Sequence, residues 1–393
     1  MGDPDSWRSD SPIVAMADGP DGPLPPPELV CSLAGLAVPP RVILGWVVRD
    51  PGWLESEEAS LITTLMVGAG TRSAVRSAAV KAVSTRLSAI PRLLHGRLRP
   101  TVAVVGAHEE PGTGRWRVAG SPGWALTAAR VADGVVIERW PGPPTDGRPA
   151  LPDCQILGVY DRSEPPDAPQ TSRVGEEQRS VGRLVAGLIP PGATVQWGPG
   201  AIGAAVVDAL ETPVRVRSGL VTDELVDLAD RGLLIGEAEA SYIWGGPRLQ
   251  EMIVSGRLRL KEIDYTHDLT AISGVERFHA INTAVQVGLD GSVNVERVAG
   301  RTVAGPGGHP DFATGASRSP GGMSIVALVS TAGGRSTIVA VPEVVSTPRS
   351  DVDVVVTEHG VADLRGCSDA ERAERLVAIA APQHRGALLD GLP

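Results

Sequence analysis

The residues of this chain with the types and spacing to do chemistry lie in three glycine-rich segments. The first is "GPGAIG" (198–203), which contains Gly198 and Gly200. The second is "GPGGHPDFATGASRSPGG" (305–322), and the third is "VVTEHGVADLRG" (355–366). Glycine lets the backbone approach a ligand closely, and N–H groups at helix starts bind anions. The segments therefore indicate a ligand site built largely from main chain.

The first two segments each have a second interpretation. Segment 198–203 lacks both a dinucleotide fingerprint and the Lys-Ser/Thr of a phosphate loop, so alone it favours a packing turn. The glycines and prolines of 305–322 predict an irregular loop, either ordered around a ligand or mobile at the surface. The seven histidines show no metal-ligand spacing, so we expect no metal site, and for a lone histidine such as His309 a structural role is the default.

The composition limits the partners and the compartment. The net charge of −10 comes from 36 basic and 46 acidic residues, and the arginines are scattered, so we expect no nucleic-acid partner. Three distant cysteines without CxxC spacing predict no disulfide framework and favour a reducing, cytoplasmic location. No run of 18 apolar residues occurs, so we expect no membrane association.

The elements that position the glycine-rich segments are predicted to form two domains. A chain of 393 residues is long for one domain. After the N-terminus, proline and glycine are dense over 140–154, and prolines recur over 161–172. We therefore predict domains at 1–172 and 173–393. "LAGLAVPPRVILGW" (33–46) resembles "VAGLIPPGATVQWG" (185–198), which indicates two similar α/β domains.

Hydrophobic periodicity gives the elements around the segments. Apolar residues three and four apart over 178–189 predict a helix, and Ser368 with Glu371 forms a capping box before another. Strands are predicted where Val and Ile are dense. These runs are 194–197, 323–331, 336–344 and 351–360. The predicted fold class is α/β, with two open domains and mostly parallel sheets.

Taken in order, the motifs resemble the acetyl-CoA hydrolase/acyl-CoA:carboxylate CoA-transferase family, which includes 4-hydroxybutyrate and butyryl-CoA:acetate CoA-transferases. "LIPPGATVQWGPGAIGAAVVDAL", "INTAVQVGLDGSVNVE", "GPGGHPDF" and "VVTEHGVADLRG" carry the resemblance, which is dense over 176–390 and weaker before. The resemblance implies two similar open α/β domains with an acyl-CoA site between them. It also implies coenzyme A as substrate rather than permanent cofactor, and a small carboxylic acid as a second substrate.

The stretch 281–300 predicts two strands joined by a tight turn, a hairpin that carries Gln286. The resemblance places this glutamine at the family's nucleophile. In the family a glutamate attacks the acyl-CoA thioester and then carries CoA as a glutamyl thioester. The family pattern "INSALEVDLTGQVN", laid on "INTAVQVGLDGSVN" (281–294), puts this glutamate at Gln286, and Gly288 and Ser292 also depart from it. An amide cannot carry CoA in this way. An engineered exchange would account for Gln286 alone, so the pattern favours divergence.

Two functions follow from the resemblance. In an acyl-CoA hydrolase or altered acyl transferase, Gln286 holds a water or the thioester carbonyl, His309 is the general base, and the N–H of Gly360 stabilises the oxyanion. The alternative is an inactive acyl-CoA-binding protein or the non-catalytic partner of an intact homologue. The resemblance implies a homodimer or heteromer. The expected contacts to acyl-CoA are Gly198, Gly200, Gly307, Gly308, Asp311, Phe312 and Glu358.

Overall fold

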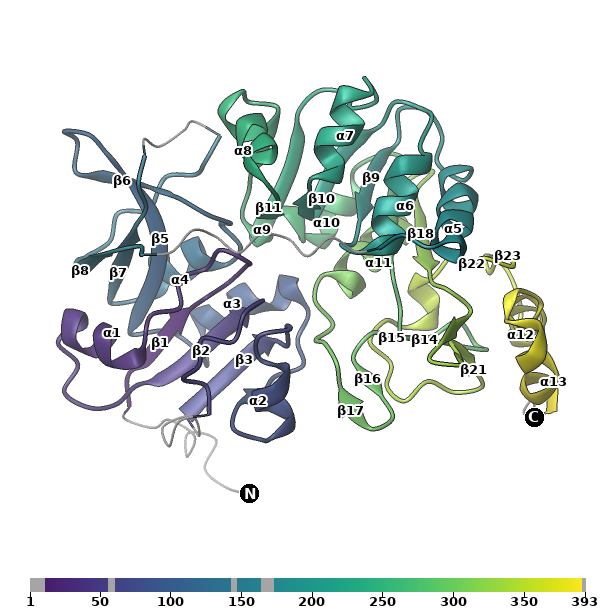
Figure 1. Cartoon of the computed structure of the whole chain (residues 1–393), viewed down its shortest axis with the longest axis horizontal. Helices are drawn as coiled ribbons and strands as arrows, with labels where there is room; N and C mark the ends of the chain where they lie inside the picture. The colour runs from purple at the N-terminus through teal and green to yellow at the C-terminus, as the bar shows by residue number, and fades with distance from the viewer. Residues whose placement is uncertain (1–10, 56–60, 143–146, 164–172, 391–393) are drawn as a thin grey trace. The chain divides into compact units, whose positions relative to one another are not determined.

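The computed structural model describes residues 11–55, 61–142, 147–163 and 173–390, and these form two compact units (Figure 1). The described residues before 164 form the first unit, apart from 84–88 and 147–148. Those two short segments belong to the second unit, together with everything described from 173 onward. The predicted boundary at 172 lies outside the described residues.

The first unit is built on an eight-stranded sheet in the order β4-β3-β2-β1-β5-β7-β8, with β6 paired to β5. All pairs are parallel except β5 with β6. The strands are β1 (Ile13–Met16), β2 (Arg41–Trp46), β3 (Ile62–Met66), β4 (Lys81–Ala82), β5 (Val102–Glu110), β6 (Arg115–Val118), β7 (Gly134–Arg139) and β8 (Ile156–Asp161). Its α-helices are α1 (Pro27–Ala34), α2 (Arg72–Arg76), α3 (Ile90–His95) and α4 (Ala125–Val131).

The second unit repeats this topology with an eight-stranded sheet in the order β12-β11-β10-β9-β13-β18-β22-β23. Only β22 and β23 pair antiparallel. The strands are β9 (Thr194–Trp197), β10 (Arg215–Thr222), β11 (Ala238–Trp244), β12 (Leu258–Leu260), β13 (Phe278–Asn282), β18 (Met323–Ala327), β22 (Val354–Thr357) and β23 (Gly360–Asp363). In each sheet the first strand of the unit is internal, three strands extend to one side, and the later strands extend to the other. The prediction of two similar α/β domains with mostly parallel sheets is confirmed.

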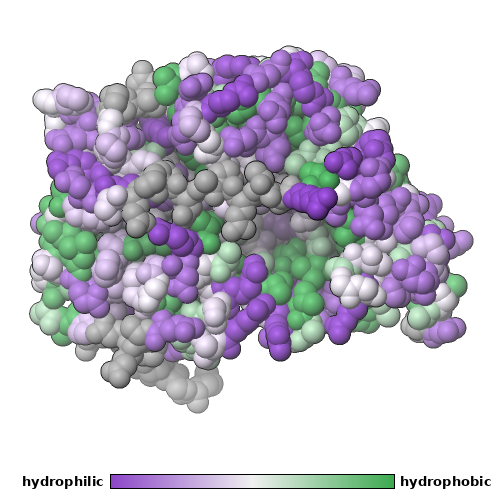
Figure 2. Space-filling model, viewed as in Figure 1, coloured by the Kyte–Doolittle hydropathy of each residue, from purple (hydrophilic) through white to green (hydrophobic). Residues whose placement is uncertain are grey.

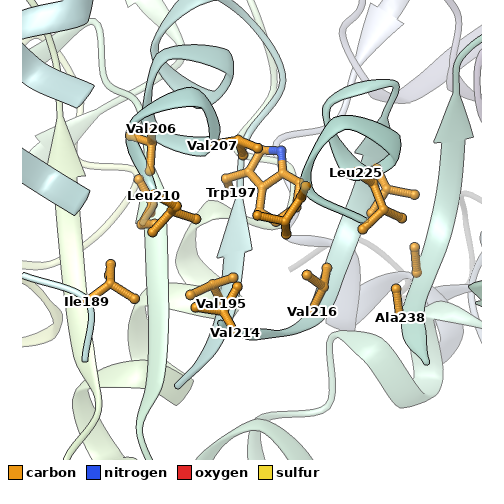
Figure 3. Packing of buried hydrophobic residues seen from close by; sticks show 14 of the residues in the cluster. Ile189, Val195, Trp197, Val206, Val207, Leu210, Val214, Val216, Leu225 and Ala238 are labelled. Atoms are coloured by element: carbon orange, nitrogen blue, oxygen red, sulfur yellow. The ribbon is translucent and has the colours of Figure 1, made fainter. Parts of the chain in front are cut away.

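Helices cover both faces of the second sheet. One face packs its valines and Trp197 against α5 (Glu176–Ala186), α6 (Ala201–Ala209), α7 (Glu224–Asp230) and α8 (Pro247–Val254) (Figure 3). On the other face Phe278 and Ala280 of β13 pack against Ile272 of α10 (Leu269–Ser273) and Phe312 of α11 (His309–Arg318). The remaining helices are α9 (Ile263–Thr266), α12 (Asp369–Ile379) and α13 (Pro382–Asp390).

Local signals predicted several of these elements. Strand β9 has the predicted bounds, and the Ser368 hydroxyl oxygen accepts from Glu371 N–H while the Glu371 carboxylate accepts from Ser368 N–H, so α12 begins with the predicted capping box. Helix α5 buries Val181, Val185 and the following Ile189, as its periodicity predicts. Hydrophilic and hydrophobic residues are interspersed over the face shown in Figure 2. Among the described residues, no helix combines the length and apolar character needed to cross a bilayer.

Two predictions from composition were wrong. Segment 305–322 is not an irregular loop throughout, because His309–Arg318 forms α11. Pro310 stands in the first helical turn, where a missing N–H costs nothing, and Gly315 gives room to Ile272, whose Cγ2 would lie 2.4 Å from an added Cβ. The strand predicted over 336–344 is present only as two short strands, β20 (Arg335–Ser336) and β21 (Ile338–Val339). The chain after β21 is not a buried strand, because Val341 is 81% exposed.

Candidate functional site

The second sheet reverses its strand order between β9 and β13. From β9 the chain builds β10, β11 and β12 to one side, and then returns to lay down β13, β18 and β22 on the other. Ligands of open parallel sheets bind outside the carboxyl ends of the strands at such a reversal. Helix α11 runs from the hairpins after β13 back to β18, so its first turn lies at this carboxyl edge. The three glycine-rich segments therefore reach one edge of one sheet.

The loop after β9 is shorter than the glycine-rich segment 198–203, because part of that segment is helical. Gly198 N–H donates to the Ile281 carbonyl of β13 at 3.1 Å, and α6 already begins at Ala201. Gly200 has a φ of 110°, in the region that favours glycine, and an added Cβ at Gly198 or Gly200 would meet no atom within 4 Å. The backbone here is open to a ligand, and contact of these glycines with acyl-CoA stays a prediction.

Two buried amide side chains lie on β9 and β13, next to this segment. The sequence alone does not predict them as part of a site. Gln196 of β9 is 3% exposed and Asn282 of β13 is 6% exposed. Gln196 Nε2 donates to Asn282 Oδ1 at 3.3 Å, while Gln196 Oε1 and Asn282 Nδ2 find no partner among the described residues. The signal in the sequence was a polar residue inside each of two apolar strands, which is costly unless it is used.

The loop before α11 is held by residues 84–88, which precede it by more than 200 positions. Leu87 N–H donates to the Gly307 carbonyl at 3.1 Å, and Asp311 accepts from Ser88 N–H at 3.0 Å and from Ser88 Oγ at 2.5 Å. Arg86 lies 3.7 Å from the same carboxylate. Burial outweighs these contacts and raises the pKa of Asp311 to about 6.

Gly308 and Phe312, two of the expected contacts to acyl-CoA, both pack against His267 in the structure. Gly308 leaves room for His267, whose Nε2 would lie 2.7 Å from an added Cβ. Phe312 is 2% exposed and packs on the His267 ring, with the ring centres 4.8 Å apart. Asp311 and Phe312 thus hold the helix and its loop in place. Their direct contact with acyl-CoA stays a prediction.

His309 opens α11 and is the only titratable side chain predicted to act as a base. Its Nδ1 lies 2.8 Å from Thr347 Oγ1, and its Nε2 is buried without a partner among the described residues. Burial lowers the pKa of His309 to about 4, so the ring is neutral at physiological pH. A neutral imidazole with one free nitrogen can accept a proton in the tautomer that has its hydrogen on Nδ1.

Gln286 lies on the predicted hairpin, in which β14 (Gln286–Gly288) pairs antiparallel with β15 (Val293–Asn294). Its Oε1 accepts from Asn294 Nδ2 at 2.8 Å and from Glu343 N–H at 3.1 Å. The segment 343–347 therefore contacts two of the three predicted catalytic positions, since Thr347 at its other end lies 2.8 Å from His309 Nδ1. Gln286 and His309 therefore lie in the same unit, and each contacts this segment.

The other departures from the family pattern have a steric consequence. An added Cβ at Gly288 would lie 2.8 Å from Asp290 Oδ1, 2.9 Å from Pro342 Cδ and 3.0 Å from Ser292 Oγ. Asp290 itself accepts from the N–H and the hydroxyl of Ser292. These residues form a self-contained turn that leaves no room for a side chain at position 288.

The third glycine-rich segment, 355–366, covers most of β22, the turn after it and all of β23. The Glu358 carboxylate accepts from Ser330 N–H at 2.8 Å and from Ser330 Oγ at 2.5 Å, which joins this turn to the chain after β18. Gly360 has a φ of 146° and begins β23. Glu358 fixes the turn through Ser330, and the roles predicted for Glu358 and Gly360 toward a ligand stay predictions.

Known proteins are similar to this chain in sequence and in fold. A family model described as the acetyl-CoA hydrolase/transferase C-terminal domain matches residues 249–392. The chain is 30% identical to 4-hydroxybutyrate coenzyme A transferase of Clostridium kluyveri over 344 residues, which cover 83% of this chain and 80% of that protein.

Two solved structures resemble the whole chain. The crystal structure of 4-hydroxybutyrate CoA-transferase from Porphyromonas gingivalis superposes with a TM-score of 0.74 at 25% identity. RipA from Yersinia pestis superposes with a TM-score of 0.83 at 23% identity, a likeness of fold. Each alignment covers 98% of this chain and 94% of the other.

Proposed function

Because the chain belongs to the acetyl-CoA hydrolase/CoA-transferase family, we propose that it binds acyl-CoA and passes the acyl group to water without a glutamyl-CoA intermediate. The observation that carries this proposal is the amide at Gln286, where the resemblance places the nucleophilic carboxylate. An amide oxygen is neutral and already accepts two hydrogen bonds in the structure, so it does not attack a thioester.

His309 supplies the base in this proposal. Its Nδ1–H donates to Thr347 Oγ1, and its Nε2 takes a proton from the attacking water. The water oxygen bonds to the thioester carbon, the carbon–sulfur bond breaks, and the proton passes to the sulfur of the departing CoA. The products are a carboxylic acid and CoA with a free thiol.

Main-chain donors supply the rest of the site. The open backbone at Gly198 and Gly200 offers close approach to CoA. The contacts of Gly307 and Gly308 rest on the resemblance, and Gly360 N–H is the proposed oxyanion donor. Coenzyme A enters as substrate and leaves as product, so no permanent cofactor is part of the proposal. By resemblance, a small carboxylic acid is a further ligand.

One observation favours a second candidate, a non-catalytic acyl-CoA-binding protein. The pKa of His309, lowered to about 4, makes the imidazole a weak base for activating water at neutral pH. Such a protein acts as a homodimer or as the partner of a homologue with an intact glutamate. It keeps the ligand site and needs no nucleophile.

Thiol release from acetyl-CoA and butyryl-CoA separates the two functions. A hydrolase releases thiol without added acetate, and His309→Ala lowers the rate by on the order of 100-fold, whereas His95→Ala, at an exposed histidine, leaves it unchanged. A binding protein releases no thiol. Acyl-CoA at 100 times Kd raises its free energy of unfolding by about 2.7 kcal/mol, which is seen as a higher melting temperature. Acetate-dependent CoA exchange with a covalent CoA adduct would contradict both.

A further inference from the structure

The amide of Gln286 has only one orientation that its neighbours accept. The atom facing β15 lies 2.8 Å from Asn294 Nδ2, and it also lies 3.1 Å from Glu343 N. A backbone N–H only donates, so the Gln286 atom near Glu343 must be an acceptor. That atom is the oxygen, Oε1.

The orientation of Asn294 is fixed in the same way, which removes the remaining ambiguity. Asn294 Oδ1 accepts from Glu296 N–H at 2.9 Å and from Arg297 N–H at 3.0 Å, and its Nδ2 donates to the Arg297 carbonyl at 2.8 Å. A flipped Asn294 would oppose its NH2 group to two backbone N–H groups. Its Nδ2 therefore faces Gln286, and two independent donors hold Oε1.

The nitrogen of the Gln286 amide, Nε2, makes no hydrogen bond with the described residues, although the side chain is half-buried. The Glu343 carboxylate accepts from Ala299 N–H at 2.6 Å and from Gly300 N–H at 2.8 Å, and it makes no hydrogen bond with Nε2. The Nε2 amino group of Gln286 therefore has two N–H donors without an acceptor among the described residues.

We propose that Gln286 Nε2 donates a hydrogen bond to the acyl oxygen of the ligand, the thioester carbonyl of acyl-CoA or a carboxylate oxygen of the free acid. The assignment rests on the proposed function and makes it more specific. Of the two roles expected for Gln286, holding a water or holding the thioester carbonyl, the assignment selects the second. Gln286 is then the residue that distinguishes acyl-CoA from CoA without an acyl group.

Two unreactive CoA analogues test this assignment by calorimetry. Acetonyl-CoA keeps a carbonyl group but has no thioester, and S-propyl-CoA has a methylene in place of the carbonyl. Wild type should bind acetonyl-CoA about threefold to tenfold more tightly, the range of one net hydrogen bond. Gln286→Met should bring the ratio to about one, and Gln286→Glu should bring it below one, because carboxylate and carbonyl oxygens repel. Gln155→Glu, at an exposed glutamine of the first unit, is the control and should keep the wild-type ratio.

The outcomes separate the assignment from the function. Equal binding of both analogues by wild type overturns the assignment alone, with no need for a variant to fold. A wild-type ratio that persists in both Gln286 variants also overturns it. If neither analogue nor CoA binds wild type, the proposed function fails, and the assignment fails with it.

Discussion

Replacing Asp311 with asparagine should remove a pH dependence that its buried carboxyl group gives to the second unit. The side chain is fully buried at the start of α11, and burial raises its pKa from 3.8 to about 6 against the opposing hydrogen bonds of Ser88. Asparagine keeps the shape. Its oxygen can accept from Ser88 N–H, and its NH2 group can donate to Ser88 Oγ, so the anchor to residues 84–88 persists without an ionisable group.

The sign and size follow from proton linkage. Between pH 3.8 and about 6 the folded state holds a proton on Asp311 that the unfolded state has lost, so the free energy of unfolding falls as pH rises and is level above. A shift from 3.8 to about 6 corresponds to about 3 kcal/mol over the whole window. About 1.4 kcal/mol of this, near one pH unit, falls between about pH 5 and about pH 8.

Urea unfolding at both ends of that range measures the effect. The free energy of unfolding of Asp311→Asn, relative to wild type, should rise by about 1.4 kcal/mol from about pH 5 to about pH 8. Asp208→Asn, at an exposed carboxylate of α6, should run parallel to wild type. Parallel curves for Asp311→Asn would show that the carboxylate is ionised at little cost and that the account of burial is wrong.

Three further predictions concern the hairpin and the base. Gln286→Glu should keep the wild-type melting temperature, because Asn294 and Glu343 still donate to its oxygen. Mass spectrometry of this variant with acyl-CoA tests for a covalent CoA adduct, which wild type should lack. Gly288→Asp should lower the free energy of unfolding by about 1–3 kcal/mol in urea titrations, since its Cβ has no room, and an unchanged value would contradict the packing. Thr347→Val should slow thiol release about fivefold, equivalent to about 1 kcal/mol, without changing the Kd for CoA; an unchanged rate would exclude Thr347 from positioning His309.

The sequence predicted what depends on neighbours in the chain. The capping box of α12, the bounds of β9 and the hairpin at Gln286 follow from residues within about ten positions, and the structure contains all three. The sequence does not predict helix α11, because glycine and proline inside a segment usually disfavour a helix. Their actual positions, Pro310 in the first turn and Gly315 against Ile272, are the ones a packed helix tolerates.

Contacts distant in sequence could not be predicted. The anchoring of Asp311 by Ser88 spans 223 positions, and no local pattern near either residue announces the other. The same holds for Glu343, which lies 57 positions from Gln286 and completes the pair of donors on its oxygen. Such bonds depend on which loops the sheet brings to one edge, and that is decided by the whole fold.

The donors around Gln286 also explain how this position could change chemistry without cost to the fold. Asn294 Nδ2–H and Glu343 N–H satisfy an oxygen, and glutamate and glutamine both present one there. The two side chains differ only at the other terminal atom, which is an anionic oxygen in one and an NH2 group in the other. Exchange at this position therefore leaves the hairpin intact, and in the proposed site it gives a ligand a hydrogen-bond donor in place of an anionic oxygen. An aspartate at position 288, as in the family pattern, would crowd Pro342, whose Cδ lies 2.9 Å from an added Cβ.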